Sequence, residues 1–149
     1  MIQRIQSVYL FLVTLILSIS AFIAQGYFLT VDGAQYNFKP LGLVVEDQSF
    51  STWALIALLL ISALIALFTL FVYRSRPHQI RLCILNILLL LGYYGAFTFY
   101  VIKIKSDLDA EFIPSWTIGL PGVAIILTYL ALRGVAKDEA LVRSYNRIR

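Results

Sequence analysis

The sequence has 149 residues, of which 60% are hydrophobic and 13% are charged. A water-soluble domain has about 45–50% apolar and about 25% charged residues, so this composition excludes an ordinary soluble domain of this length. The formal charge of +4 does not indicate a nucleic-acid-binding protein, because the basic residues flank long apolar segments, where membrane topology explains them. The single cysteine, Cys83, excludes an intramolecular disulfide and a cysteine metal cluster.

Four apolar segments predict four membrane-spanning helices, at residues 7–24, 53–73, 80–102 and 116–132. A helix needs roughly 20 apolar residues to cross a bilayer. The first segment also resembles a secretory signal peptide, but it is longer than the usual apolar core of about 7–15 residues. We therefore expect a single domain over residues 1–149, with an all-α membrane fold.

The polar turn at residues 74–79 sets the expected orientation, because short loops rich in Lys and Arg stay in the cytoplasm. Nine of the twelve basic residues then fall inside: Arg4, Arg74, Arg76, Arg81, Arg133, Lys137, Arg143, Arg147 and Arg149. We expect both termini in the cytoplasm, periplasmic loops at residues 26–51 and 103–115, and a cytoplasmic tail at residues 133–149. The acidic residues Asp107, Asp109 and Glu111 resemble a loose cation site, but a solvated acidic loop is the simpler interpretation.

The first outer loop contains Asp32-Gly33, which fits the two central positions of a type I′ hairpin turn. This turn pairs Val31 with Ala34, Leu29 with Tyr36 and Tyr27 with Phe38. The apolar face of such a hairpin requires cover from a third strand at residues 41–45, from the helix ends, or from a partner. Leu29, Tyr36 and Phe38 are therefore candidate partner-binding residues. The alternative is a loop without strand pairing.

Small and polar residues inside the spans predict helix packing. Asn86 is expected to form an interhelical hydrogen bond, with a ligand site as the alternative. Gly92 and Ala96 predict a close-packing face, and Ser62, Ala63 and Ala66 predict another on the second span. Pro121 removes a backbone hydrogen bond, so the fourth span is expected to be kinked or to start partly unwound, with its freed carbonyls against neighbouring helices.

The charged tail predicts a modest amphipathic helix, with Leu141, Val142, Tyr145 and Ile148 on its apolar side. Glu139 and Arg143 stand on the other side in the favourable i, i+4 order. This helix could continue from the fourth span, lie on the anionic inner leaflet, or dock on a partner. We expect a protein partner, because the fourth span already anchors the tail to the membrane.

The sequence starts Met-Ile-Gln-Arg-Ile-Gln-Ser-Val-Tyr-Leu and ends Lys-Asp-Glu-Ala-Leu-Val-Arg-Ser-Tyr-Asn-Arg-Ile-Arg. Over its full length, and most clearly at these two ends, it resembles a family of small four-helix inner-membrane proteins. That family is found mainly in bacteria of the Bacteroidota type and carries only a domain-of-unknown-function label. The resemblance implies a four-span topology and a bacterial inner membrane, and it implies no activity, cofactor or catalytic residue.

The residue inventory favours a protein without catalytic activity. An enzyme needs placed nucleophiles, acids, bases or metal ligands, and no such pattern is present. Beyond Arg81 at the start of the third span, the spans contain no Asp, Glu, Lys, Arg or His, which argues against an ion-coupled transporter. We expect an accessory or scaffolding subunit without cofactor or metal, whose partners are membrane lipids and other integral membrane proteins. The alternative is a small lipid- or solute-binding carrier, with a site near Asn86 and the Pro121 helix break.

Overall fold

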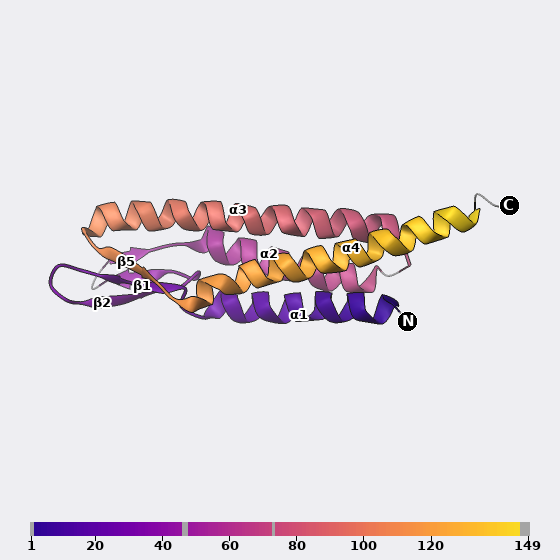
Figure 1. Ribbon diagram of the computed structural model, residues 1–149. Coiled ribbons are helices and arrows are strands. Elements are labelled where there is room, and N and C mark those ends of the chain that lie inside the picture. Colours follow the sequence, from indigo (N-terminus) through magenta and orange to yellow (C-terminus); the bar gives the residue numbers. More distant parts are fainter. Residues whose placement is uncertain (1, 46–47, 73, 147–149) are drawn as a thin grey trace.

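The computed structural model describes residues 2–45, 48–72 and 74–146. Four long helices are present among these residues: α1 (Ile2–Phe22), α2 (Trp53–Phe71), α3 (Arg76–Leu108) and α4 (Leu120–Asn146). The described strands are β1 (Gly26–Leu29), β2 (Gln35–Phe38), β3 (Leu43–Val45), β4 (Gln48–Phe50) and β5 (Glu111–Pro114), and the 3-10 helix η1 (Trp116–Gly119) precedes α4. The strands lie at one end of the helix bundle, and the α2–α3 turn and the end of α4 lie at the other (Figure 1).

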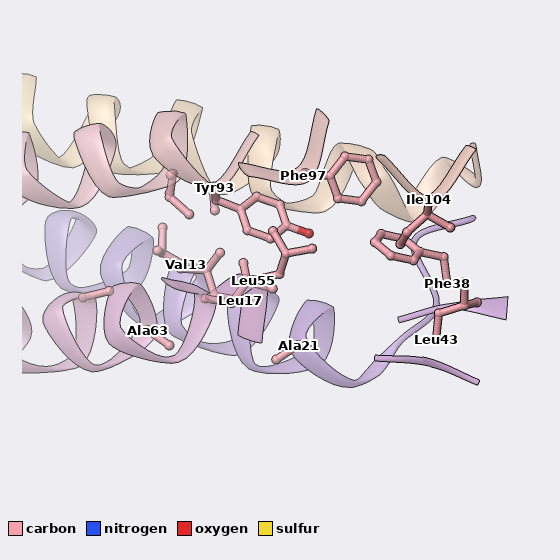
Figure 2. Packing of buried hydrophobic residues seen from close by; sticks show 14 of the residues in the cluster. Val13, Leu17, Ala21, Phe38, Leu43, Leu55, Ala63, Tyr93, Phe97 and Ile104 are labelled. Atoms are coloured by element: carbon pink, nitrogen blue, oxygen red, sulfur yellow. The ribbon is translucent and has the colours of Figure 1, made fainter. Parts of the chain in front are cut away.

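The helices form a closed ring in which α1 and α3 each pack on both α2 and α4. Buried positions recur in steps of three and four along each helix, as in Gln79, Cys83, Asn86, Leu90, Tyr93 and Phe97 of α3. An average step of 3.5 residues is typical of helices that cross at about +20° in a left-handed bundle. We call each such row of buried positions a packing seam. Figure 2 shows seam residue Tyr93 facing Leu17 of α1 and Leu55 of α2, and Phe97 further along α3 toward Phe38.

The outer surface of the bundle is apolar, as the predicted membrane spans require. Large side chains point away from the bundle, including Phe11, Leu64, Phe68, Leu88, Phe99 and Ile126. Small and polar side chains occupy the seams instead, among them Ser20, Ser62, Thr69, Asn86 and Thr128. Among the described residues, four helices are long and apolar enough to cross a membrane. Because an apolar surface this continuous is unfavourable in water, the chain is a multi-pass membrane protein.

The third helix is longer than the apolar segment that predicts it. It has 33 residues, which corresponds to about 50 Å at 1.5 Å per residue, against a hydrocarbon core of about 30 Å. Residues 103–108 were expected in the outer loop, but they continue α3. Lys103 and Lys105 are exposed there, whereas Ile104 between them is buried. The polar residues therefore form the solvent side of a helix whose other side packs against the strands.

The strands form a small domain at one end of the bundle, named the outer domain after the predicted topology, and this domain combines the α1–α2 and α3–α4 connections. The sheet has the order β2–β1–β5, and both pairings are antiparallel. The predicted hairpin in the first outer loop is confirmed, and the candidate third strand at residues 41–45 is present as β3, with Leu43 buried in the same cluster as Phe38. However, β3 does not join the sheet of the first hairpin. Leu43–Val45 pairs with β4 in a separate hairpin, and β5 from the second outer loop pairs with β1 instead.

The register of the first hairpin differs by one residue from the predicted one. Phe28 pairs with Tyr36, and Leu29 pairs with Gln35. The loop is longer than a type I′ turn: the Gly33 amide donates to the Thr30 carbonyl over 2.9 Å, and only Gly33 in this loop has a positive φ, of 80°. This is the three-residue hairpin loop with glycine in the left-handed region. The shift places Phe28, rather than Leu29, in the core.

An aromatic cluster joins the sheet to the helix bundle. The ring centroids of Phe28 and Phe38 are 5.6 Å apart, and those of Phe38 and Phe97 are 5.4 Å apart. Phe112 of β5 completes the cluster, 5.0 Å from Phe28. Figure 2 shows Phe38 and Leu43 beside Ile104 near the outer end of α3. The outer domain is therefore fixed to α3 through buried apolar contacts.

Candidate functional site

Asn86 lies on the packing seam of α3, where its side chain is 1% exposed. The Ser62 hydroxyl of α2 donates a hydrogen bond to Asn86 Oδ1. Ser62, Ala63 and Ala66 are all buried, so small side chains let α2 approach the amide closely. Within the described chain, Asn86 Nδ2 has no hydrogen-bond partner. The structure thus places Asn86 in an interhelical contact between α2 and α3.

Pro121 is the second residue of α4, and its position explains how that helix starts. The chain enters α4 through η1, so the fourth span starts with a 3-10 turn and has no proline kink in its interior. The Tyr94 hydroxyl donates to the Ile118 carbonyl over 2.8 Å, and the Thr117 hydroxyl donates to the Ala24 carbonyl over 2.6 Å. The Ile118 carbonyl, which precedes α4, therefore has a hydrogen-bond donor on the neighbouring helix α3.

The carrier hypothesis placed a ligand site near both Asn86 and Pro121, but these two features lie at different levels of the bundle. Asn86 contacts α2, whereas Tyr94 reaches the turn that precedes Pro121. Eight residues separate Asn86 from Tyr94 on α3, which is about 12 Å along the axis. The described structure does not bring the two features together into one site.

Gly92 and Ala96 do not form the expected close-packing face. Gly92 is exposed, and a Cβ built on it would meet no atom within 4 Å. Ala96 is only partly buried. The seam of α3 instead passes through Leu90, Tyr93 and Phe97, so Gly92 faces away from the other helices of this chain.

The three candidate residues of the outer hairpin do not share a surface. Phe38 is completely buried in the aromatic cluster. Tyr36 pairs with Phe28 on that same inner side and is partly buried. Because of the register shift, Leu29 belongs to the opposite face of β1. A partner cannot contact all three side chains at once, and Phe38 is inaccessible.

The tail is the continuation of α4, which runs without interruption from Leu120 to Asn146. Leu141, Val142 and Tyr145 are 49%, 41% and 76% exposed, and Ile148 lies outside the described residues. Arg143 pairs with Glu139 over 3.0 Å on the surface, in the predicted i, i+4 order. Figure 1 shows this end of α4 projecting past the other helices.

The exposed apolar residues of the tail continue the packing seam of α4. The buried part of this seam consists of Ala124, Thr128, Ala131 and Val135. The same steps of three and four lead on to Asp138, Val142 and Tyr145. Asp138 still contacts α1, since Gln6 Nε2 donates a hydrogen bond to Asp138 Oδ2 over 2.9 Å. No contact with α1 is described for Val142 or Tyr145. Val142 and Tyr145 therefore extend a packing face that the described chain does not cover.

Gln6 and Gly134 form a contact that our sequence analysis missed. Gln6 is buried, and a Cβ built on Gly134 would lie 3.0 Å from the Cγ and Nε2 atoms of Gln6. The glycine therefore lets α1 and α4 approach closely at this level. The spacing of Gln6 from Leu10 and Val13 on the α1 seam was the signal that could have identified it.

The comparisons with known proteins identify the family. The sequence model of a family described as Domain of unknown function (DUF4293) matches residues 2–148. Because this match covers nearly the whole chain, the protein belongs to that family. A search of the curated proteins finds no match. Membership agrees with the resemblance at the two ends of the sequence, and it assigns no activity.

Proposed function

We propose that this protein is a non-catalytic accessory subunit of the bacterial inner membrane, and that it holds a partner protein at the end of α4. The observation that carries this proposal is the continuation of the α4 packing seam into the exposed residues Val142 and Tyr145. A seam with steps of three and four is complete only when a second helix packs against it. The partner that fits is therefore another helix with an apolar stripe.

The geometry of α4 favours a protein over the lipid surface as the occupant of this face. A helix that lies on a leaflet must turn away from the membrane-spanning segment that precedes it. No such break occurs, because Leu120–Asn146 is one helix. At 27 residues it is about 40 Å long, so its end projects beyond a hydrocarbon core of about 30 Å. Tyr145 then stands in water, away from the acyl chains.

The charges around the seam indicate what kind of helix would dock. Lys137 is exposed beside it, and Arg143 lies on the far side of the tail, partly neutralised by Glu139. A partner helix with acidic residues at the edges of its apolar stripe would complement this basic segment. The excess of basic residues at this end also supports a cytoplasmic location for the tail, with the strands in the periplasm.

In-cell crosslinking tests the proposal on the full chain. A photoreactive amino acid is placed at Tyr145 or, as a matched control, at Ala140, which is also exposed but lies on the opposite side of the helix. We expect position 145 to crosslink to one defined membrane-associated protein, and position 140 to give no such product. Equal products at both positions would show that the seam is not the docking surface.

Affinity purification in mild detergent provides the second measurement. Loss of an aromatic anchor at the centre of an interface typically costs about 2 kcal/mol or more, which is about thirtyfold in affinity. Tyr145→Asp should therefore release the crosslinked protein, while Ala140→Asp should retain it and both variants should insert into the membrane. A wild-type protein that purifies without any stoichiometric partner, but with a defined small molecule, would favour the carrier alternative.

A further inference from the structure

A cavity of about 390 Å³ lies beside the turn between α2 and α3. Its lining consists of Phe68 and Val72 from α2, Ser75 from the turn, and His78, Arg81 and Leu82 from α3. Phe68, His78 and Arg81 are all exposed, so the cavity opens on the side of the bundle that faces the surrounding bilayer. This cavity is distant in sequence from the α4 seam and does not depend on the function proposed above.

The two ends of the cavity differ in polarity. Ser75 and His78 lie at the turn, where a spanning helix pair reaches the membrane surface. Phe68 and Leu82 lie further along their helices, toward the middle of the bilayer. Arg81 starts at the deeper level, but helical side chains lean toward the N-terminus of their helix, which brings its guanidinium back toward the turn. The cavity is therefore basic at the membrane surface and apolar below it.

The positive charge of this region has no counter-charge in the described chain. The sequence has no Asp or Glu between residues 48 and 106, and no described ion pair involves Arg74, Arg76 or Arg81. The carboxylates of α4 at this end of the bundle are engaged elsewhere, because Asp138 accepts from Gln6 and Glu139 pairs with Arg143.

The backbone at the start of α3 adds to the positive electrostatic potential of this region. Ser75 precedes the first turn of α3, and its hydroxyl does not cap the helix. In the first turn of this 33-residue helix, the amides of Arg76 and His78 therefore have no described side-chain acceptor, whereas Pro77 between them has no N–H. Helix N-termini of this kind favour anions, since their free N–H groups and the helix dipole both attract negative charge.

We propose that this cavity binds one anionic glycerophospholipid from the adjoining leaflet. Its phosphate lies between the guanidinium of Arg81, the His78 ring and the start of α3, and its glycerol and upper acyl chain lie along Phe68 and Leu82. Basic pockets between membrane helices commonly recognise lipid headgroups in this way. The apolar half of the cavity and its lateral opening distinguish a lipid from a free phosphate ion, which would require neither feature.

Native mass spectrometry of the delipidated full-length protein tests this site, with phosphatidylglycerol or phosphatidylcholine of the same acyl chains added in detergent. We expect one bound phosphatidylglycerol and weaker binding of phosphatidylcholine. Arg81→Gln should weaken phosphatidylglycerol binding about fivefold, the effect of removing one cationic side chain at a membrane surface. Arg133→Gln is the matched control, because Arg133 is an exposed arginine of α4 outside the cavity.

A second variant tests the apolar half without changing the charge. Leu82→Trp fills the cavity and should also reduce phosphatidylglycerol binding. Three outcomes would overturn the proposal: equal binding of the two lipids, an equal loss in Arg133→Gln, or displacement of the bound lipid by inorganic phosphate at the same concentration. The last result would identify a site for free anions instead of a lipid.

Discussion

Gly26 occupies a position in β1 where any side chain would collide with the neighbouring strand. A Cβ at this position would lie 2.6 Å from Cζ of Phe112 and 2.7 Å from the carbonyl oxygen of Ile113. The ring could rotate, but the carbonyl belongs to the backbone of β5 and cannot move without disturbing the sheet. The absence of a side chain therefore lets the second outer loop pair with the first.

Gly26→Ala is expected to destabilise the protein. Forcing extra atoms into a packed site typically costs about 1–3 kcal/mol, and the free energy of unfolding in detergent should fall by this amount. The control is Gly92→Ala, because a Cβ there meets no atom within 4 Å and alanine favours a helix by about 1 kcal/mol over glycine. Equal destabilisation by the two substitutions would contradict the packing of β5 against β1.

The contact between Asn86 and Ser62 is suited to a double-mutant cycle. Interhelical hydrogen bonds in membranes contribute about 0.6 kcal/mol on average and rarely above about 1.7 kcal/mol. Asn86→Ala and Ser62→Ala should each lower the free energy of unfolding, and the double substitution should cost less than the sum of the two. Additive effects would show that the two side chains do not interact, and would return Asn86 to consideration as part of a ligand site.

At the scale of elements, the hairpin loop depends on the conformation of Gly33, whose φ is 80°. A left-handed conformation costs a residue with a Cβ roughly 1–2 kcal/mol, and a β-branched side chain disfavours it most. Gly33→Val should therefore increase the protease sensitivity of the loop in spheroplasts. Val31→Ala is a suitable control, because Val31 is 88% exposed and its side chain contributes little to the sheet.

The hairpin also shows which parts of the fold the sequence could predict. Asp32-Gly33 is compatible with a two-residue loop and with a three-residue loop, and these loops differ by one residue in register. Local sequence does not distinguish them. The deciding contact is the packing of Phe28 against Phe112, which comes from the other outer loop. A pairing between strands more than 80 residues apart leaves no local pattern, so β5 could not be predicted either.

The four membrane-spanning helices could be predicted from the length of their apolar segments. Each spanning segment is recognisable because the bilayer imposes roughly 20 apolar residues on it. The extension of α3 could not be recognised in this way, because Lys103 and Lys105 are charged and are typical of a loop. In the structure, Ile104 between them is buried, so these residues form one exposed and one buried side of a helix. The exposed end of α4 was predicted as an amphipathic helix, but its continuity with the buried seam required the structure.

At the scale of the molecule, α3 and α4 extend past the bundle at opposite ends (Figure 1). The extension of α3 supports the strands through Ile104, next to the contact between Phe97 and Phe38, so that end is folded against its own chain. The extension of α4 carries Val142 and Tyr145 with no cover from the described residues. The strand end is thus packed against its own chain, whereas the α4 end has an exposed apolar surface. The orientation of the protein in the membrane determines which compartment this surface faces.

Charge predicts that this surface faces the cytoplasm. The end with the α2–α3 turn and the tail carries Arg74, Arg76, Arg81, Arg133, Lys137 and Arg143, whereas the end with the strands carries Lys39, Lys103 and Lys105. Because Lys and Arg in short loops are retained in the cytoplasm, the strands should be periplasmic. The test uses single cysteines in a Cys83→Ala background and a membrane-impermeant maleimide.

Two exposed positions at opposite ends of the bundle provide the comparison. Cysteine at Val31, in the hairpin loop, should react in intact cells. Cysteine at Ser75, in the α2–α3 turn, should react only after the inner membrane is permeabilised. Labelling of the Ser75 position in intact cells would reverse the orientation. It would also place the exposed end of α4 in the periplasm, where a partner would have to be sought among periplasmic or outer-facing proteins.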